Sequence, residues 1–349
     1  MSVRNHPEFD HHEEVVFFDE PSVGLKAIVA IHNTRRGPAL GGCRMYPYES
    51  EDAALNDVLR LSKGMTYKSA ISGLPLGGGK SVIIGDPQRD KSTALFEAFG
   101  RCLERLDGRY IVAEDSGTSV EDLHIIATQT RHVSGVGERQ MPDGGVADGD
   151  PSPATAYGVL TGIQAAIRHG LGRDDLRGVG VAVQGVGSVG RRLVEHLRTA
   201  GARVTVTDVF RDRSRAVAAE LGVTEVEPEA IYGAEVDVFA PCALGGILND
   251  ETIPRLKARI VAGAANNQLW RPEHGERLHT LGICYVPDFA INAGGVIDIA
   301  GYQAGLSYAE SLEQVGRIGG TITEILRRAR AENRPTAQVA LEMAQENLR

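Results

Sequence analysis

A glycine-rich turn between an apolar strand and a helix restricts the fold of this chain more than any other feature. The apolar run Val179–Gln184 leads into Gly185-Val-Gly-Ser-Val-Gly190, and a helical pattern follows as far as Gly201. In such a G-x-G-x-x-G turn, the first glycine allows a tight bend, the second lets backbone approach a diphosphate, and the third lets helix and strand pack closely. Unpaired N–H groups at the helix N-terminus favour the anion. The turn therefore predicts a βαβ unit that binds a dinucleotide.

An acidic residue follows this turn at the expected distance. The next apolar run, 203–207, ends at Asp208, about 20 residues beyond the glycines. A carboxylate there accepts hydrogen bonds from a ribose 2′-hydroxyl and repels a 2′-phosphate, so the sequence favours NAD over NADP. Arg211 and Arg213 lie nearby and could neutralise a phosphate. The alternative is that three glycines fell at this spacing by chance and that Asp208 is a surface residue.

The chain length and the pattern of apolar runs predict an α/β protein of two domains. We expect residues 1–145, completed by the C-terminal helices 325–349, to form the first domain. Residues 146–324 then form the dinucleotide-binding domain. Short apolar runs separated by helices or loops predict its doubly wound parallel sheet, and they lie at 179–184, 203–207, 236–240, 259–263 and 283–286.

Charge and cysteine content exclude several classes of protein. The net charge is −9 and basic residues form no block, which argues against nucleic acid as a partner. No apolar segment is long enough to span a bilayer, and the N-terminus lacks the apolar core of a secretory signal. The four cysteines are far apart, as is typical of a reduced, cytoplasmic protein. His11 and His12 lack metal-ligand spacing, so we expect no metal site.

A second glycine run, Gly77-Gly-Gly-Lys80, resembles a phosphate-binding loop but fails its spacing, because residue 74 is leucine. Three residues without side chains instead bring Lys80 to a place of close approach. Lys68 lies 12 residues earlier, at the end of an amphipathic helix. Two lysines near one cleft would lower each other's pKa and offer both an anion site and a neutral amine. The alternative is that Lys80 is an ordinary surface lysine.

Other polar residues follow predicted strands. Asp115 comes after the apolar run 110–113, and Asn266, Asp288 and Asn292 fall at the carboxyl edge of the second predicted sheet, where α/β proteins bind ligands. Asp115 could instead cap a helix, although Thr118 or Ser119 suits that role better because Glu121 and Asp122 follow. Asn266 and Asn267 could be turn formers.

Several long segments together resemble the NAD-dependent L-amino acid dehydrogenases of the glutamate, leucine, phenylalanine and valine dehydrogenase superfamily, the leucine branch most of all. The resemblance covers about residues 15–301 and rests on the segments that begin at Leu25, Gly37, Lys63, Asp150, Ala240, Gly263 and Ile291. It implies an N-terminal domain that forms homo-oligomers, a Rossmann-type NAD-binding domain and an active site in the cleft between them.

The resemblance also implies roles for individual residues. Lys68 would bind the substrate α-carboxylate, Lys80 would activate water as a base, and Asp115 would carry protons to and from the amino nitrogen. The remaining substrate-binding positions would be Leu40, Gly41, Gly42, Ala113, Asn266, Ala290 and Val296. The cofactor-binding positions would be Thr155, Gly185, Gly187, Ser188, Val189, Gly190, Asp208, Cys242, Ala243, Asn266 and Asn292.

The implied reaction is the reversible oxidative deamination of an apolar L-amino acid to its 2-oxo acid and ammonia. The glutamate branch has a lysine where this chain has Leu40, so a second carboxylate would have no partner. A branched aliphatic side chain is favoured. An aromatic one, as in a phenylalanine or tryptophan dehydrogenase, is the alternative, because Ala290 is smaller than the valine of leucine dehydrogenases. Two different functions also fit the same scaffold, namely a non-catalytic NAD-binding sensor and an enzyme of amines or N-methyl amino acids.

The chain also departs from the family pattern. Cys43 stands in place of a usual threonine and Ser116 in place of a valine. Gly77-Gly-Gly-Lys80 is closer to the aromatic and valine-type enzymes, and residues 297–305 differ from the usual acidic stretch. The identity of the substrate therefore depends on experiment.

Overall fold

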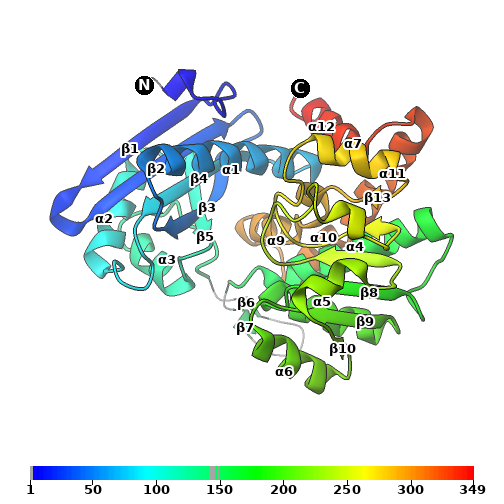
Figure 1. Cartoon of the computed structure of the whole chain (residues 1–349). Helices are drawn as coiled ribbons and strands as arrows, with labels where there is room; N and C mark the ends of the chain where they lie inside the picture. Colours follow the sequence, from blue (N-terminus) through cyan, green and yellow to red (C-terminus); the bar gives the residue numbers. More distant parts are fainter. Residues whose placement is uncertain (1–2, 138, 141–145, 148) are drawn as a thin grey trace. The chain divides into compact units, whose positions relative to one another are not determined.

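The computed structural model describes residues 3–137, 139–140, 146–147 and 149–349 (Figure 1). The chain forms two compact units. The first consists of Met1–Asp150, Ile299–Ala309 and Asn347–Arg349, and the second of Pro151–Asp298 and Glu310–Glu346. The expected boundary at residues 145 and 146 adjoins positions outside the described residues.

The first unit contains a mixed five-stranded sheet in the order β1-β2-β4-β3-β5. β1 and β2 pair antiparallel, β4 runs antiparallel to β2, and β3 runs parallel to both β4 and β5. The strands are β1 (Glu14–Glu20), β2 (Leu25–Asn33), β3 (Ala39–Tyr46), β4 (Gly77–Ile84) and β5 (Tyr110–Glu114). The apolar runs 15–18 and 25–31 of the sequence, which predict two strands, correspond to β1 and β2.

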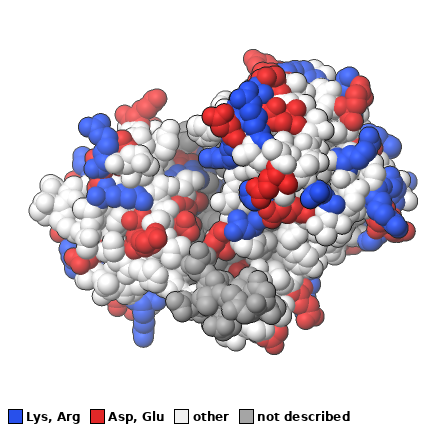
Figure 2. Space-filling model, turned by 90° about the horizontal axis from the view of Figure 1, so that it is seen from below, with Lys and Arg blue, Asp and Glu red and all other residues white. Residues whose placement is uncertain are grey.

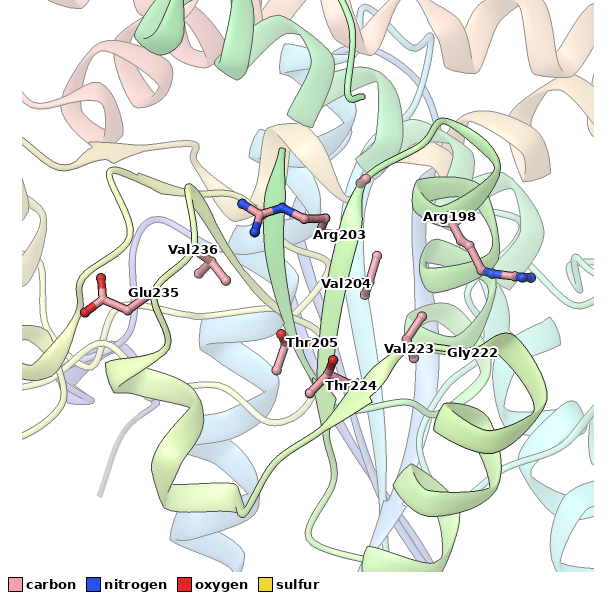
Figure 3. Close-up of a pocket in the computed structure, with 11 residues that line it drawn as sticks. Arg198, Arg203, Val204, Thr205, Gly222, Val223, Thr224, Glu235 and Val236 are labelled. Carbon is pink, nitrogen blue, oxygen red and sulfur yellow. The ribbon is translucent and has the colours of Figure 1, made fainter. Parts of the chain in front are cut away.

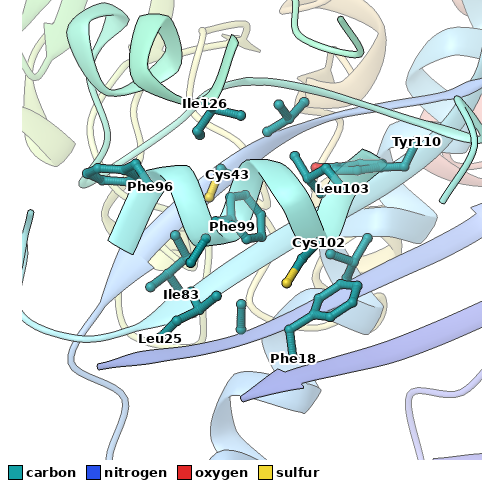
Figure 4. Close-up of a cluster of buried hydrophobic side chains, with 14 of the residues drawn as sticks. Phe18, Leu25, Cys43, Ile83, Phe96, Phe99, Cys102, Leu103, Tyr110 and Ile126 are labelled. Atoms are coloured by element: carbon teal, nitrogen blue, oxygen red, sulfur yellow. The ribbon is translucent and has the colours of Figure 1, made fainter. Parts of the chain in front are cut away.

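Helices cover both faces of this sheet. β2 carries apolar side chains on both of its sides, and each side packs against helices. Ala27, Val29 and Ile31 join a core with side chains of α2 (Thr93–Glu104) and α3 (Val120–Ala127), part of which Figure 4 shows. Ile28 and Ala30 join a second core beneath α1 (Glu51–Ile71). Side chains alternate between the faces of a strand, so one continuous apolar run supplies both cores.

The second unit contains a six-stranded parallel sheet in the order β10-β9-β8-β11-β12-β13. Counted within this unit, the order is 3-2-1-4-5-6, that of a Rossmann fold, which confirms the predicted doubly wound sheet. The strands are β8 (Gly180–Gln184), β9 (Arg203–Thr207), β10 (Thr224–Glu225), β11 (Val238–Pro241), β12 (Ile260–Val261) and β13 (Cys284–Tyr285). Its main helices are α4 (Ser152–Leu171), α5 (Ser188–Thr199), α6 (Arg211–Leu221), α7 (Glu273–Thr280), α8 (Asp288–Ile291), α11 (Ile318–Glu332) and α12 (Thr336–Glu346).

The C-terminal helices differ from the expectation that residues 325–349 complete the first domain. α11 buries Ile318, Ile322, Ile325 and Leu326, and the helix packs along α4. Gly158 of α4 allows this approach, because an added Cβ would lie 2.6 Å from Ile318 Cδ1. α12 packs on α11 and α7, so both helices belong to the second unit and only Asn347–Arg349 to the first.

The remaining elements are short or lie at the limits of the two units. They are β6 (Arg139–Gln140), β7 (Val146–Ala147), α9 (Gly294–Gln303), α10 (Tyr308–Gly316) and the 3₁₀ turns Val3–Asn5, Pro21–Val23, Pro228–Gly233 and Ile253–Arg255. Among the described residues, no helix is both long and apolar enough to cross a membrane. On the face seen in Figure 2, acidic and basic side chains are interspersed.

Two buried histidines, one in the N-terminal segment and one on β2, contact α1. His12 Nε2 lies 3.0 Å from Ser62 Oγ and His32 Nδ1 lies 2.8 Å from Thr66 Oγ1, with the two ring centroids 4.8 Å apart. Burial, with the neighbouring His12 adding to it, lowers the pKa of His32 from 6.5 to about 4. Both rings are therefore neutral in the folded protein at neutral pH.

This histidine pair predicts acid sensitivity. The unfolded chain protonates His32 near pH 6.5 and the folded chain only near pH 4, so stability is complete above pH 6.5 and falls as the pH falls between these values. We expect His32 to contribute about 2 kcal/mol of this loss between pH 7 and pH 5. In urea titrations, His32→Gln should show a correspondingly weaker pH dependence than the wild type. His124→Gln, at an exposed position on α3, is the control, and an unchanged pH dependence in His32→Gln would contradict the prediction.

Candidate active site

A lysine and a carboxylate meet inside the first unit. Lys80 lies on β4 with 6% of its side chain exposed, and Asp115 directly follows β5. Lys80 Nζ lies 3.0 Å from Asp115 Oδ2. The alternative of a surface lysine is therefore wrong, and the two sequence candidates for proton transfer are in direct contact.

The charge of Asp115 is maintained by its neighbours. Burial alone would raise the pKa of this carboxyl, but Lys80 and Arg44 outweigh it and lower the pKa below its usual value. Arg44 Nε donates to the same oxygen, Oδ2, at 2.9 Å. Asp115 is thus an ionised carboxylate at neutral pH, in contact with two cationic groups.

Glycines make room for this pair. A Cβ added to Gly42 on β3 would lie 2.6 Å from Asp115 Cβ and 3.2 Å from Lys80 Nζ. A Cβ added to Gly78 would lie 2.0 Å from the backbone nitrogen of Thr66 in α1. The run 77–79 therefore brings β4 against α1 and neighbouring strands, which explains the close approach that the sequence predicted.

The other candidates of the first unit lie on β3, β5 and α1. Leu40 lies two residues before Gly42 on β3, so both share the sheet face on which Lys80 and Asp115 meet. Ala113 pairs with Gly42 across β3 and β5 and is buried. Lys68 is half-buried in the last turn of α1, two residues after Thr66. Gly41 alone faces the opposite side, where an added Cβ would lie 1.8 Å from Gly79 O.

Asp115 does not serve as a helix cap. Ser119 is the N-cap of α3, and its side chain and that of Asp122 form a reciprocal capping box. This confirms the predicted cap and leaves the Asp115 carboxylate to the ion pair with Lys80 and Arg44. Cys43, the first departure from the family pattern, is buried in the core on the α2 side of the sheet, and burial raises the pKa of its thiol to about 12.

Three residues of this site were missed at the sequence level: Arg44, Asp57 and Tyr48. Arg44 Nη1 lies 2.9 Å from Asp57 Oδ2, and the Tyr48 hydroxyl donates to the same oxygen at 2.6 Å. One signal was available, because an arginine within the otherwise apolar and glycine-rich segment 39–46 is a partly buried charge that requires a partner.

The glycine fingerprint of the second unit has the predicted geometry. Gly185 has a φ of +93° after β8, and Gly190 packs so closely that an added Cβ would lie 2.0 Å from Gly185 O. Gly187 is the N-cap of α5, followed by Ser188 and Val189, and no side chain caps this helix end. A Cβ added to Gly187 would meet nothing within 4 Å. Uncapped N–H groups beside open space fit a diphosphate.

Asp208 is held in place by backbone groups. It directly follows β9 and is buried, with Val186 N donating to Oδ2 at 3.0 Å and Phe210 N donating to Oδ1 at 2.9 Å. The alternative of an exposed surface residue is therefore wrong. Arg213 lies 3.7 Å from Oδ2, and Arg211 is engaged with Glu225 and Glu227, so neither arginine is without a carboxylate partner.

The other candidates of the second unit lie near the carboxyl ends of its strands or on adjoining helices. Asn292 Nδ2 donates to Asn266 Oδ1 at 2.8 Å, while the buried Asn292 Oδ1 accepts no hydrogen bond from the described residues. This open acceptor fits the amide of a nicotinamide ring. Cys242 and Ala243 border the fingerprint, and Thr155 lies at the start of α4 beside Gly295. Ala290 of α8 and Val296 of α9 are buried.

A cavity of about 480 Å³ lies elsewhere in this unit (Figure 3). Its lining includes Gly180, Arg203 and Thr224, the first residues of β8, β9 and β10. It is therefore at the amino end of these strands, opposite the end where α/β sheets bind nucleotides. Among the described residues, His, Cys, Asp and Glu form no group that could hold a metal ion.

Comparisons with known proteins identify the family to which both units belong. A model of the dimerisation domain of Glu/Leu/Phe/Val dehydrogenases matches residues 12–132, and a model of glutamate/leucine/phenylalanine/valine dehydrogenases matches residues 210–346. Leucine dehydrogenase of Geobacillus stearothermophilus is 49% identical over 100% of this chain and 94% of its own. Phenylalanine dehydrogenase of Bacillus thermotolerans is 45% identical over 98% and 90%. The crystal structure of L-tryptophan dehydrogenase from Nostoc punctiforme is 40% identical, with a TM-score of 0.81 over 97% and 96%.

The two glycines at the start of α5 predict separable effects. Gly187→Ala should fold normally, because its Cβ meets no atom, but should weaken NADH binding about tenfold by filling the space before the helix N-terminus. Gly190→Ala should lower the melting temperature, because its Cβ would collide with Gly185 O. NADH fluorescence titration and thermal unfolding measure the two effects. Wild-type NADH affinity in Gly187→Ala would contradict this placement of the cofactor.

Proposed function

Because this chain belongs to the glutamate, leucine, phenylalanine and valine dehydrogenase family, we propose that Lys80 and Asp115 carry out the proton transfers of its reaction. The protein is an NAD-dependent amino acid dehydrogenase. It catalyses the reversible oxidative deamination of apolar amino acids to 2-oxo acids and ammonia. The buried contact of 3.0 Å between Lys80 Nζ and Asp115 Oδ2 is the observation that supports these roles.

We propose a division of labour among the residues of the first unit. Lys68 binds the substrate α-carboxylate. Lys80, in its neutral form, removes a proton from the water that attacks the imine carbon, and its Nζ lies 3.0 Å from Asp115 Oδ2. Asp115 accepts a proton from the substrate ammonium group and later returns it to the amino group, which leaves as ammonia. Proton transfers of this kind typically contribute 10²- to 10⁴-fold to a rate.

We propose that the residues of the second unit bind NAD and hold the substrate beside it. NAD supplies a hydride acceptor for the bond at Cα. Gly185, Gly187 and Gly190 admit the diphosphate, while Asp208 binds the adenosine ribose. Asn292 Oδ1 accepts from the carboxamide near Thr155, and the neighbouring Asn266 contacts the substrate. The open space at Gly187 and the open acceptor on Asn292 support this assignment.

The pocket residues support an apolar side chain on the substrate. Leu40 and Ala113 are buried and carry no group that could pair with a second carboxylate. We propose a branched aliphatic substrate. The phenylalanine and tryptophan dehydrogenase relatives and the small Ala290 favour an aromatic one as the second candidate. A difference of one methylene in the pocket changes the preference between two substrates by only about 10- to 200-fold. The rates with 4-methyl-2-oxopentanoate and phenylpyruvate must therefore be measured side by side to distinguish the aliphatic from the aromatic substrate.

Replacement of the proposed catalytic residues should separate chemistry from binding. We expect Lys80→Ala and Asp115→Asn to lower kcat at least about 100-fold while circular dichroism and NADH affinity stay near wild type. Lys63→Ala is the matched control, because this lysine of α1 also pairs with an aspartate, Asp10, but at a half-exposed position. Near-normal turnover in either variant would overturn the assigned roles. Tight NADH binding without turnover in the wild type would favour a sensor.

We propose that the protein is a cytoplasmic homo-oligomer. The match of residues 12–132 to a dimerisation domain supports self-association, and the four free cysteines are typical of a reducing compartment. Sedimentation velocity should show a single species of at least two chains at micromolar concentration. A monomeric profile over the whole concentration range would contradict this proposal.

A further inference from the structure

The two oxygens of the Asp115 carboxylate have different surroundings. Oδ2 accepts from Lys80 Nζ at 3.0 Å and from Arg44 Nε at 2.9 Å. Oδ1 accepts no hydrogen bond from the described residues, and 22% of the Asp115 side chain is exposed. One oxygen is therefore saturated with cationic donors, and the other is open.

We propose that Arg44 is a positioning residue that fixes Oδ2 of Asp115 and thereby makes Oδ1 the oxygen that exchanges protons with the substrate nitrogen. This inference rests on the proposed role of Asp115 in proton transfer. Without Arg44, the carboxylate could rotate about its Cβ–Cγ bond and offer either oxygen to Lys80. With Arg44 in place, both cations share one oxygen, and the open one is left to the substrate.

A second carboxylate holds Arg44 itself. The guanidinium is planar, so two bonds at Nε and Nη1 fix both its position and its plane. Nη1 lies 2.9 Å from Asp57 Oδ2 on α1, and the Tyr48 hydroxyl holds the same oxygen at 2.6 Å. Arg44 is thus fixed between β3 and α1, and its direction toward Asp115 does not depend on bound ligand.

Few other groups could titrate near Asp115. Lys80 and Arg44 are its direct cationic partners. Around them, burial raises the pKa of Cys43 to about 12 and raises the pKa values of Tyr48 and Tyr110 well above their usual range, so these three stay neutral at physiological pH. Asp57 is engaged by Arg44 and Tyr48. Removal of the Arg44 charge should therefore act on the Asp115 carboxylate and raise its pKa.

Arg44→Gln tests this proposal in the direction of amino acid oxidation, which requires the ionised carboxylate. We expect kcat to fall about tenfold or more, the KM for NAD to stay within about twofold, and the acid limb of the kcat/KM profile to move up by about half a pH unit or more. Arg60→Gln, which removes an exposed arginine from α1, should match the wild type in all three. An acid limb of wild-type position in folded Arg44→Gln would overturn the proposal.

Arg44→Lys keeps the test decisive if Arg44→Gln does not fold. The amine retains the charge, so the acid limb should stay near the wild type. It cannot reach Asp115 and Asp57 in one plane, so kcat should still fall at least about threefold. Wild-type kcat in Arg44→Lys would overturn the positioning role. Asp115→Asn distinguishes the two levels of the account, because near-normal turnover there would refute the proposed function whatever the Arg44 variants do.

Discussion

The buried carboxylate of Asp115 constrains how the strands of the first unit are arranged, because its charge requires cationic partners. A buried carboxylate is costly unless its charge is matched, and here Lys80 and Arg44 supply that match at one oxygen. Both partners lie on strands of the same sheet, so the contact requires β3, β4 and β5 to be parallel neighbours in their present register. The mixed sheet of the first unit thus places the charged groups as well as the core.

Glycine is what allows these charges to meet. At Gly42 a side chain would occupy the place of Asp115 Cβ, and at Gly78 it would collide with α1. The second unit uses the same device at Gly185 and Gly190, where strand and helix backbones approach each other. Gly187 differs, because its missing side chain leaves open space instead of a contact. The glycines therefore serve close packing at most of these positions and leave open space at one.

The sequence predicted the second unit better than the first. A parallel sheet with short connections produces regularly spaced apolar runs, and the glycine fingerprint shows where the first strand ends. The Rossmann fold and the position of Asp208 at the end of the next strand were therefore predictable. The family was predictable as well, and the comparisons confirm it. In the first unit, β3 was not predicted, because Gly41 and Gly42 interrupt its apolar pattern. Its antiparallel and parallel pairings depend on contacts between distant segments, which no local pattern records.

Ion pairs and helix docking were the least predictable features. Lys80 was predicted from the glycine run before it and Asp115 from the apolar run before it. Arg44 and Asp57 are 13 residues apart and are joined only by the packing of α1 on the sheet. The sequence of α11 has an apolar face that includes Ile322 and Ile325, yet the face alone does not tell which unit buries it. The packing of α11 on α4, with Ile318 close to Gly158, is visible only in the structure.

The most direct test of the central claim is the rate of NADH oxidation by the wild-type enzyme with ammonia and a panel of 2-oxo acids. The panel contains 4-methyl-2-oxopentanoate, 3-methyl-2-oxobutanoate, phenylpyruvate, indolepyruvate and 2-oxoglutarate. The account predicts ammonia-dependent turnover of the apolar acids, greatest for a branched aliphatic one, and little or none of 2-oxoglutarate. Absence of turnover with every acid, while NADH still binds, would contradict it and would identify the protein as a non-catalytic NAD-binding member of its family.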